Sequence, residues 1–177
     1  MAKMTLPRRC QPIEAIVLDV DGVLTDGGII YTDRGEEIKA FHVRDGSGLK
    51  FWQQAGKKAA IITGRRSEIV VRRALELGLK PVVQGVDDKL AALEKMLKDW
   101  KLTPDAICYI GDDLLDLAPM REVGLAVAVA DACPEAIEDA HYVTAARGGR
   151  GAVREAIELI MKSQGVWDDL VTQYRGE

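Results

Sequence analysis

The chain has 177 residues, of which 47% are hydrophobic and 29% are charged, a balance that predicts one folded domain and excludes global disorder. Its net charge of −4 argues against nucleic acid as the main partner, because a phosphate backbone needs a basic surface. The sequence has neither an apolar run of 18 residues nor a signal-peptide pattern, so we expect a cytoplasmic protein with no membrane partner.

Six short apolar runs alternate along the chain with amphipathic segments. Nearly unbroken apolar runs are typical of strands in a parallel sheet that is covered on both faces. The amphipathic segments predict helices, and Gly56, Gly78 and Gly124 follow three helices, where a left-handed cap is expected. The predicted strands are 15–20, 59–63, 81–84, 107–110, 125–129 and 141–143, and the predicted amphipathic helices are 67–77, 87–101, 114–123 and 152–161. Their alternation predicts an α/β fold with a doubly wound, mostly parallel sheet.

Residues 28–43 interrupt this alternation directly after the first strand. They read as a strand, a turn at residues 33–35 and a second strand, which predicts a β-hairpin insertion. An isolated hairpin is only marginally stable in water, so its apolar side chains need cover, and we expect another subunit to provide it. The prediction for residues 1–177 is therefore a single domain with this hairpin and with a C-terminal tail at about 165–177.

Candidate functional residues follow the first two predicted strands of the parallel sheet. Asp19 stands where the first strand ends, and Asp21 lies two residues further on in the loop. Ligands of doubly wound sheets bind beyond the carboxyl ends of the strands, so Asp19 should point into that crevice. Thr63 ends the next strand, where its hydroxyl can bond a phosphate oxygen. Each of the three can also serve as a turn or capping residue.

Lys89 and the sequence GDDLLD at residues 111–116 complete the set. Lys89 opens a helix from a position off its apolar face, where a solvated lysine is the ordinary alternative. Asp112, Asp113 and Asp116 follow a predicted buried strand. An N-cap with acids in the first helical turn explains one or two of these carboxylates, but three of them indicate a bound cation.

The ordered set DxD, Thr, Lys and GDDxxD resembles the haloacid dehalogenase-type phosphohydrolase superfamily over nearly the whole chain. The resemblance implies that Asp19 is a nucleophile that forms an aspartyl-phosphate and that Asp21 is a general acid and then a general base. It also implies a Mg²⁺ ion held by side-chain oxygens of Asp19 and Asp112 and by the backbone carbonyl of Asp21. Thr63 and Lys89 would hold the phosphate.

Two further expectations come from the same resemblance. Asp113 and Asp116 would orient the waters of the metal ion, or Lys89, from behind the metal ligands. The only insertion after the first motif is a hairpin, and residues 63–89 leave no room for a folded domain. The protein is therefore expected to lack the cap domain that most members of the superfamily carry.

Longer stretches resemble one family within that superfamily, the 3-deoxy-D-manno-octulosonate 8-phosphate (Kdo 8-phosphate) phosphatases. The stretches are LDVDGVLTDGGIIY, FHVRDGSGLK, ITGRRSEIVVRRALELG, YIGDDLLDL, GLAVAVADA and GGRGAVREAI. The similarity implies hydrolysis of Kdo 8-phosphate to Kdo and phosphate in lipopolysaccharide synthesis. It also implies a homotetramer in which hairpins pack together and neighbouring subunits complete each active site.

This substrate carries a carboxylate besides its phosphate and needs a second anion clamp. Arg65 and Arg73 match the substrate arginines of the family, and a planar guanidinium suits a carboxylate. Residues 42–46 match its substrate-contacting loop, with His42 at a position that is often Asn, and Lys50 stands where Arg is more frequent. The implied substrate-binding residues are Asp21, His42, Val43, Arg44, Asp45, Gly46, Lys50, Arg65, Arg73 and Lys89.

Other functions stay open at this point. Phosphatases of nine-carbon keto sugar acid 9-phosphates, of the sialic acid type, look similar but tend to carry an acid after Gly64, so Arg65 favours Kdo 8-phosphate. A catalytically silent oligomerisation module would lack the nucleophile or the lysine, whereas Asp19 and Lys89 are present. A generic small-phosphate hydrolase is the remaining option. The amphipathic tail after Gly165 is a hypothetical lid over the active site of a neighbouring subunit.

Overall fold

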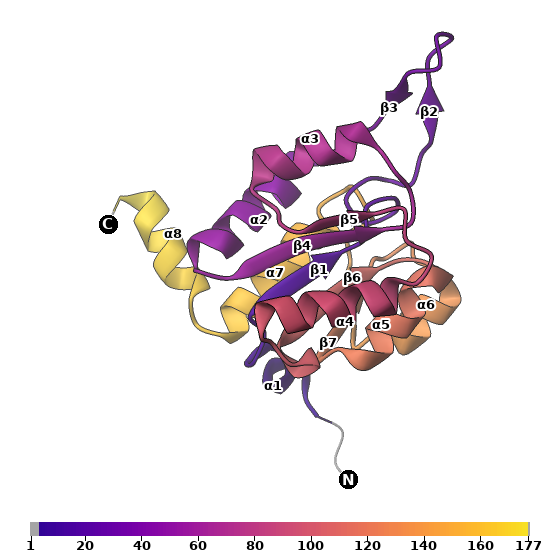
Figure 1. Cartoon of the computed structure of the whole chain (residues 1–177). Helices are drawn as coiled ribbons and strands as arrows, with labels where there is room; N and C mark the ends of the chain where they lie inside the picture. Colours follow the sequence, from indigo (N-terminus) through magenta and orange to yellow (C-terminus); the bar gives the residue numbers. More distant parts are fainter. Residues whose placement is uncertain (1–3, 177) are drawn as a thin grey trace.

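The computed structural model of the chain describes residues 4–176, and none of the helices in that range is long and apolar enough to cross a membrane. Six parallel strands form the central sheet in the order β5-β4-β1-β6-β7-β8 (Figure 1). They are β1 (Ala15–Leu18), β4 (Lys58–Thr63), β5 (Val82–Gln84), β6 (Ile107–Gly111), β7 (Leu125–Ala128) and β8 (Tyr142–Val143). The predicted α/β fold with a mostly parallel sheet is therefore confirmed.

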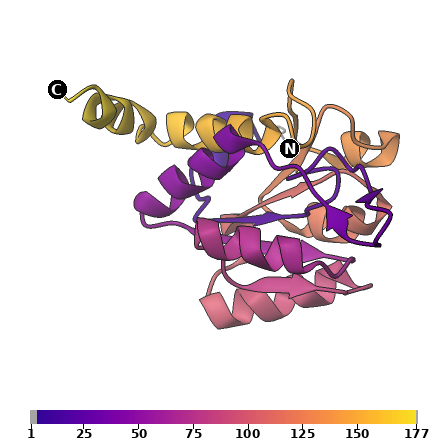
Figure 2. The ribbon, with the colours of Figure 1, turned by 90° about the horizontal axis from the view of Figure 1, so that it is seen from above.

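Helices cover both faces of this sheet. Helix α7 contacts α1 and α2 in one layer, whereas α5 contacts α4 and α6 in the other layer (Figure 2). The helices are α1 (Leu6–Cys10), α2 (Val43–Gln54), α3 (Glu68–Leu77), α4 (Lys89–Trp100), α5 (Leu117–Glu122), α6 (Pro134–Asp139), α7 (Ala152–Ser163) and α8 (Trp167–Arg175), with 3₁₀ turns at η1 (Pro104–Ala106) and η2 (Leu114–Asp116). Strands β1, β6 and β7 are buried along their whole length, so the core lies on both sides of the sheet.

Three local expectations need correction. Gly56 and Gly78 have the expected positive φ angles of 78° and 71°, but Gly124 does not, and α5 ends instead at extended Val123. Gly124 is required for another reason, because a Cβ there would collide with the backbone carbonyl of Asp105. The predicted helix 114–123 begins as a 3₁₀ turn, and residues 43–46 are not a loop but the first turn of α2.

The predicted hairpin is present as a separate two-stranded antiparallel sheet that projects from the body of the molecule (Figure 1). Its strands are β2 (Ile30–Tyr31) and β3 (Glu37–Ile38), each only two residues long. Ile29, Ile30, Tyr31 and Ile38 are 47–60% exposed. The apolar side chains of the hairpin are thus not completely covered by the rest of residues 4–176.

The C-terminal tail forms α8, which lies at the opposite end of the molecule from the hairpin (Figure 1). Its Trp167 is 9% exposed and meets the edge of Phe51 on α2, with ring centroids 6.4 Å apart. The guanidinium of Arg154 on α7 lies over both rings. The tail therefore packs against its own chain, away from the strand ends that follow β1 and β6.

Candidate active site

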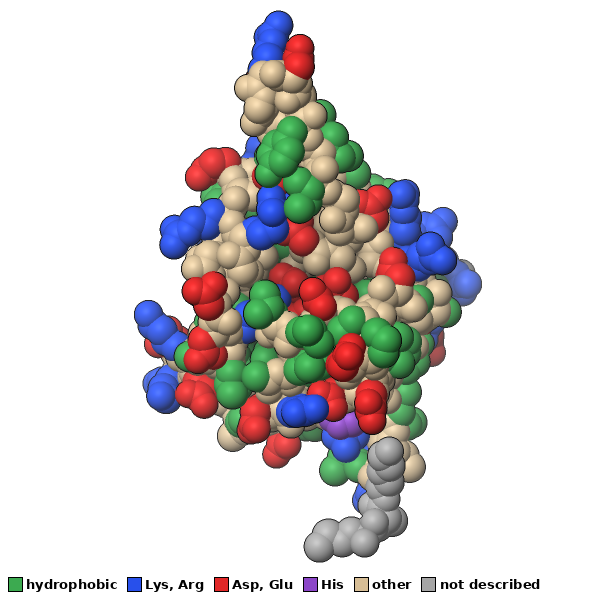
Figure 3. Space-filling view, turned by 90° about the vertical axis from the view of Figure 1, so that its right-hand side faces the viewer, with side chains coloured by type: hydrophobic (Ala, Val, Ile, Leu, Met, Phe, Trp, Pro, Cys, Tyr) green, Lys and Arg blue, Asp and Glu red, His purple; other side chains and the backbone are tan. Residues whose placement is uncertain are grey.

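Side chains from three neighbouring strands meet at the carboxyl edge of the sheet. Asp19 directly follows β1, Thr63 ends β4 and Asp112 directly follows β6, and these strands lie side by side in the sheet. The carboxyl ends of parallel strands share one edge, so the three side chains converge there. Together with Asp21, Gly64, Arg65, Lys89, Asp113 and Leu115 they line a cavity of about 180 Å³, which we call the strand-end cavity. Figure 3 shows acidic side chains gathered below the projecting hairpin.

Lys89 reaches this cavity from the first position of α4. The helix begins there because the side chain of Asp88 accepts a hydrogen bond from the amide of Ala91, as an N-cap does. The Lys89 residue is only 3% exposed, and its Nζ lies 2.9 Å from Asp19 Oδ2 and 2.7 Å from Asp116 Oδ1. Burial lowers the pKa of Lys89, but the two carboxylates outweigh it and raise the pKa overall. The solvated-lysine alternative is therefore wrong.

Two buried carboxylate oxygens in the cavity lack a partner. Asp19 Oδ1 and Asp112 Oδ1 make no hydrogen bond within the described part of the chain. Burial and the neighbouring carboxylates raise the pKa of Asp19 to about 6 and that of Asp112 to about 7. Carboxylate oxygens of Asp19, Asp112 and Asp116 lie within 4.8 Å of one another. Carboxylates that repel one another and still have oxygens without a partner form a group suited to bind a hard divalent cation.

Asp116 has a different role from the other two acids. Its side chain is completely buried and accepts bonds from Lys89 Nζ and Tyr109 Oη at Oδ1, and from the amides of Asp112 and Asp113 at Oδ2. With both oxygens engaged, Asp116 supports Lys89 and the loop rather than offering a free ligand atom. Asp113 is the N-cap of η2, accepting from the amide of Leu114, so the capping explanation holds for this acid.

Gly22 brings the loop after Asp21 against Asp112 in the strand-end cavity. Its φ is +92°, and a Cβ at this position would collide with the carboxylate of Asp112. Only glycine combines that backbone conformation with such a close approach. The DxDG motif at residues 19–22 and the GDD motif at residues 111–113 are therefore packed directly against each other.

The hairpin supplies polar groups to the site that sequence reasoning missed. Lys39, directly after β3, forms an ion pair with Asp21, whose other carboxylate oxygen lies 3.5 Å from Arg65 Nε. Glu37 lies 3.3 Å from both cations and accepts a hydrogen bond from Ser67 Oγ at 2.6 Å. That bond and the charge of Lys39 hold the pKa of Glu37 below its ordinary value. The available signal was alternation, since residues 37 and 39 point to the same side of an extended strand.

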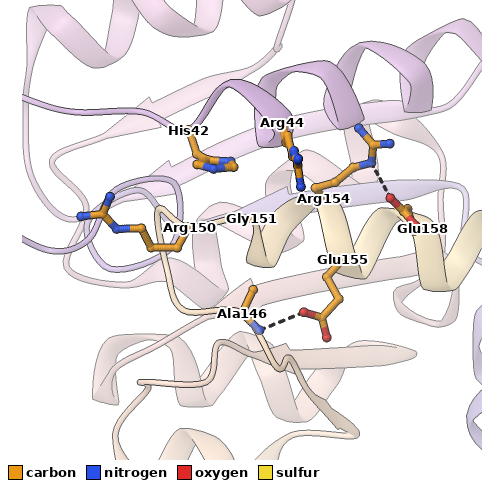
Figure 4. Close-up of a pocket in the computed structure, with 8 residues that line it drawn as sticks. All are labelled: His42, Arg44, Ala146, Arg150, Gly151, Arg154, Glu155 and Glu158. Carbon is orange, nitrogen blue, oxygen red and sulfur yellow. Dashed lines mark hydrogen bonds and ion pairs between the residues drawn. The ribbon is translucent and has the colours of Figure 1, made fainter.

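The remaining residues of the implied substrate set are not gathered in the strand-end cavity of one chain. Arg73 and Val43 line a second cavity of about 460 Å³, together with Lys39, Phe41, Ile69, Arg72 and Glu76. His42 and Arg44 line a third cavity of about 460 Å³ at the start of α7, where Figure 4 shows them beside Arg150 and Arg154. Lys39 lies beside both Asp21 and Arg73's cavity, so it joins the second cavity to the strand-end cavity.

Asp45, Gly46 and Lys50 have positions that do not reach any of these cavities. The carboxylate of Asp45 is buried and accepts from the amides of Gly151 and Arg154, which holds α2 against the start of α7. A Cβ on Gly46 would collide with the guanidinium of Arg73. Lys50 lies exposed on α2. Within one chain, Asp45 and Gly46 therefore contribute to helix packing, and Lys50 faces solvent.

Comparisons with known proteins show which proteins this chain is similar to. The family model for haloacid dehalogenase-like hydrolases matches residues 82–157. The 3-deoxy-D-manno-octulosonate 8-phosphate phosphatase of Yersinia pestis is 47% identical over 157 residues, which cover 89% of this chain and 84% of the relative.

Two solved structures of such phosphatases are also similar and hold metal ions. The enzyme of Moraxella catarrhalis, in complex with a magnesium ion, a phosphate ion and KDO, has a TM-score of 0.94 and 44% identity, covering 96% of this chain and 97% of that one. The cobalt-bound enzyme of Haemophilus influenzae has a TM-score of 0.86 and 39% identity, covering 89% and 92% of the two chains.

Proposed function

We propose that this chain, which belongs to the Kdo 8-phosphate phosphatase family of the haloacid dehalogenase-like hydrolases, hydrolyses Kdo 8-phosphate to Kdo and phosphate. It is a phosphatase of the Kdo pathway, and the expected cytoplasmic location of that step is part of the proposal. One observation carries the mechanism. Asp19, Asp21, Asp112 and Lys89 line one cavity, and two carboxylate oxygens in it are buried without a partner.

Asp19 is the proposed nucleophile and Asp21 the proposed proton carrier. A carboxylate oxygen of Asp19 attacks the phosphorus, the bond to the sugar oxygen breaks, and Asp21 donates a proton to the departing alkoxide. Asp21 then takes a proton from water, which attacks the phosphorus of the aspartyl-phosphate and releases phosphate and the free Asp19 carboxylate. The buried position of Asp19 and the loop position of Asp21 support this division of roles.

Lys89 and Thr63 are the proposed phosphate-binding groups of the chain. The Lys89 ammonium already lies 2.9 Å from Asp19, so it is near the place where negative charge accumulates during transfer. The Thr63 side chain is buried in the same cavity wall and offers a hydroxyl. Asp19 and Asp116 hold Lys89 in place before substrate arrives, which favours stabilisation of the transition state over simple binding.

The cofactor is Mg²⁺, the ion bound in the Moraxella catarrhalis relative. Asp19 and Asp112 would hold it through their unpartnered oxygens, and the backbone carbonyl of Asp21 would be a third ligand. When bound, Mg²⁺ supplies the positive charge that lets a phosphate approach a carboxylate and that stabilises the transferring group. Asp116 is not part of the proposed ligand set because its oxygens already bind Lys89, Tyr109 and two amides.

The sugar acid requires groups beyond the strand-end cavity. Arg65 lies at its rim, beside Asp21, and is the proposed partner of a substrate anion. Val43 and Arg73 line the second cavity, which Lys39 joins to the strand-end cavity. His42, residues 44–46 and Lys50 lie elsewhere on the chain, so their proposed contacts require a neighbouring subunit. We therefore propose a homotetramer of single-domain, capless chains whose exposed hairpins pack together and complete one another's sites.

The test is phosphate release from three esters, with Mg²⁺ or with EDTA. Kdo 8-phosphate should be preferred over a sialic-type 9-phosphate and over p-nitrophenyl phosphate by about 100-fold or more in kcat/KM. Activity should vanish with EDTA and in Asp19→Ala, and it should survive in the control Asp99→Ala, which removes an exposed acid on α4. Release without preference would discard the substrate, and no release from any ester would overturn the phosphatase function.

A further inference from the structure

We propose that the hydroxyl of Tyr109 is a positioning group for the phosphatase reaction, because it fixes the Asp116 carboxylate that holds the Lys89 ammonium against Asp19. Tyr109 would contact neither substrate nor metal and would act only through Asp116. The inference rests on the proposed function, since the role that it assigns belongs to that reaction.

The hydrogen-bond geometry connects Tyr109 to the site through a single carboxylate oxygen. Tyr109 Oη donates to Asp116 Oδ1 at 2.8 Å, and Lys89 Nζ lies 2.7 Å from the same oxygen. The second oxygen of Asp116 accepts from the amides of Asp112 and Asp113 at 3.0 and 3.3 Å. Each oxygen thus has two donors, and the carboxylate plane is defined by partners on both sides.

Tyr109 occupies a buried position where its hydroxyl needs a hydrogen-bond partner. It lies in the middle of β6, whose residues are all buried, and its own side chain is fully buried. A phenol in such a strand has to find a hydrogen-bond partner, whereas Phe would fill the same volume without that requirement. Burial and the nearby Asp116 carboxylate raise the pKa of Tyr109, so its hydroxyl keeps the proton that it donates.

The side chain of Asp116 occupies the space that a side chain at position 111 would fill. Residues 109 and 111 point to the same face of β6, because side chains alternate along a strand. A Cβ at position 111 would lie 2.5 Å from Asp116 Cβ and 2.8 Å from Asp116 Oδ2. The absent side chain of Gly111 therefore lets Asp116 fold back over the strand and meet the Tyr109 hydroxyl.

Loss of the hydroxyl should affect the reaction rather than substrate binding. Among the described residues, Asp116 Oδ1 would keep Lys89 as its only donor, and the carboxylate could rotate about its hydrogen bonds to the amides of Asp112 and Asp113. The Lys89 ammonium would remain in the site but would be held less firmly in the direction of Asp19. Positioning groups behind a reacting side chain typically contribute about 10-fold or more to the rate.

The test compares Tyr109→Phe with the matched control Tyr142→Phe. Tyr142 Oη also donates to a carboxylate, that of Glu155, at 2.7 Å, but this pair lies outside the strand-end cavity. We expect kcat for Kdo 8-phosphate with saturating Mg²⁺ to fall about 10-fold in Tyr109→Phe, with KM changed less than about 2-fold. Tyr142→Phe should keep the kcat of wild type, and thermal melting should confirm that both variants are folded.

A double variant tests whether Tyr109 acts through Asp116. In an Asp116→Asn background, Tyr109→Phe should cause no further loss of kcat, because the carboxylate that it orients is gone. The inference would be overturned if the kcat losses of Tyr109→Phe and Asp116→Asn multiply in the double variant. An unchanged kcat in Tyr109→Phe, or an equal loss of kcat in Tyr142→Phe, would also overturn it. If Tyr109→Phe does not fold, Tyr109→Met also removes the hydroxyl at similar volume and carries the same expectation.

The two proposals fail in distinguishable ways. A wild-type protein that releases no phosphate from any ester overturns the proposed function, and the inference with it. An active wild type whose Tyr109→Phe variant keeps full kcat overturns the inference alone.

Discussion

Lys89 and the acids of the GDDLLD motif show how the fold decides the chemistry of individual residues. A lysine at a helix start is usually solvated, yet Lys89 is 3% exposed because Asp19 and Asp116 offset its desolvation. Asp113, by contrast, is an ordinary N-cap, and Asp116, three residues later, is completely buried beneath it. The same motif therefore contains a capping residue, a free metal-ligand candidate at Asp112 and a supporting carboxylate.

At the same scale, Arg65 should determine the preference for a substrate with a second anion. Arg65→Met removes the guanidinium beside Asp21 and Glu37, and kcat/KM for Kdo 8-phosphate should fall about 10- to 100-fold. The loss for p-nitrophenyl phosphate, which has no carboxylate, should be at least about 5-fold smaller. Arg66→Met, which removes the exposed neighbouring arginine, is the control. Equal losses for both esters would contradict a role of Arg65 in carboxylate recognition.

The hairpin is the element that the packing of a single chain explains least. Its two strands have two residues each, and apolar side chains lie on its surface (Figure 3). Its base, however, is tied to the site through Lys39 and through Glu37, which binds Arg65 and Ser67. An element that exposes apolar side chains and also contacts the active site through Glu37 and Lys39 is suited to join subunit contact with the active site.

We expect Ile30→Asp to dissociate the proposed tetramer into smaller species, because a carboxylate would be buried among apolar hairpin side chains without a partner. Sedimentation equilibrium at micromolar protein measures the change, and kcat/KM should fall with it. Ile137→Asp, at an isoleucine 38% exposed on α6, should leave the mass unchanged. A wild-type chain that sediments as a monomer would contradict this assembly.

On the scale of the whole molecule, the acid cluster should make stability depend on pH and metal. The folded metal-free protein holds a proton on Asp112 up to about pH 7, whereas an unfolded Asp loses it near pH 4. Between these values the folded state binds more protons, so the free energy of unfolding in EDTA should fall as pH rises. A bound cation would offset this loss by pairing with the ionised carboxylates.

Asp112→Asn tests that expectation by thermal unfolding at pH 8. In EDTA its Tm should exceed that of wild type by about 3 °C, which corresponds to roughly 1 kcal/mol for a chain of this size. Mg²⁺ should raise the Tm of wild type but not that of the variant. The control Asp99→Asn changes an exposed acid and should behave like wild type. A variant less stable than wild type in EDTA would contradict repulsion within the cluster.

Local pattern was sufficient for most of the fold and for the candidate site motifs. Apolar runs located all six strands of the parallel sheet within two residues, because burial on both faces leaves a continuous apolar signature. Helix α2 was less clear, since Gly46 and Gly48 lower helix propensity. A Cβ on Gly46 would collide with Arg73, and one on Gly48 would lie 2.9 Å from Arg154 Cδ, so neighbouring helices explain both glycines.

The sequence by itself thus determined the α/β architecture, the hairpin and the acidic motifs at the strand ends, because periodicity and strand order are local properties of the chain. Only the tertiary structure decided that Lys39 reaches Asp21, that Tyr109 bonds Asp116 and that Asp45 ties α2 to α7. Each of these contacts joins different elements, so it depends on which segments pack together. No local spacing contains that information, whereas the packed sheet and its helices specify it.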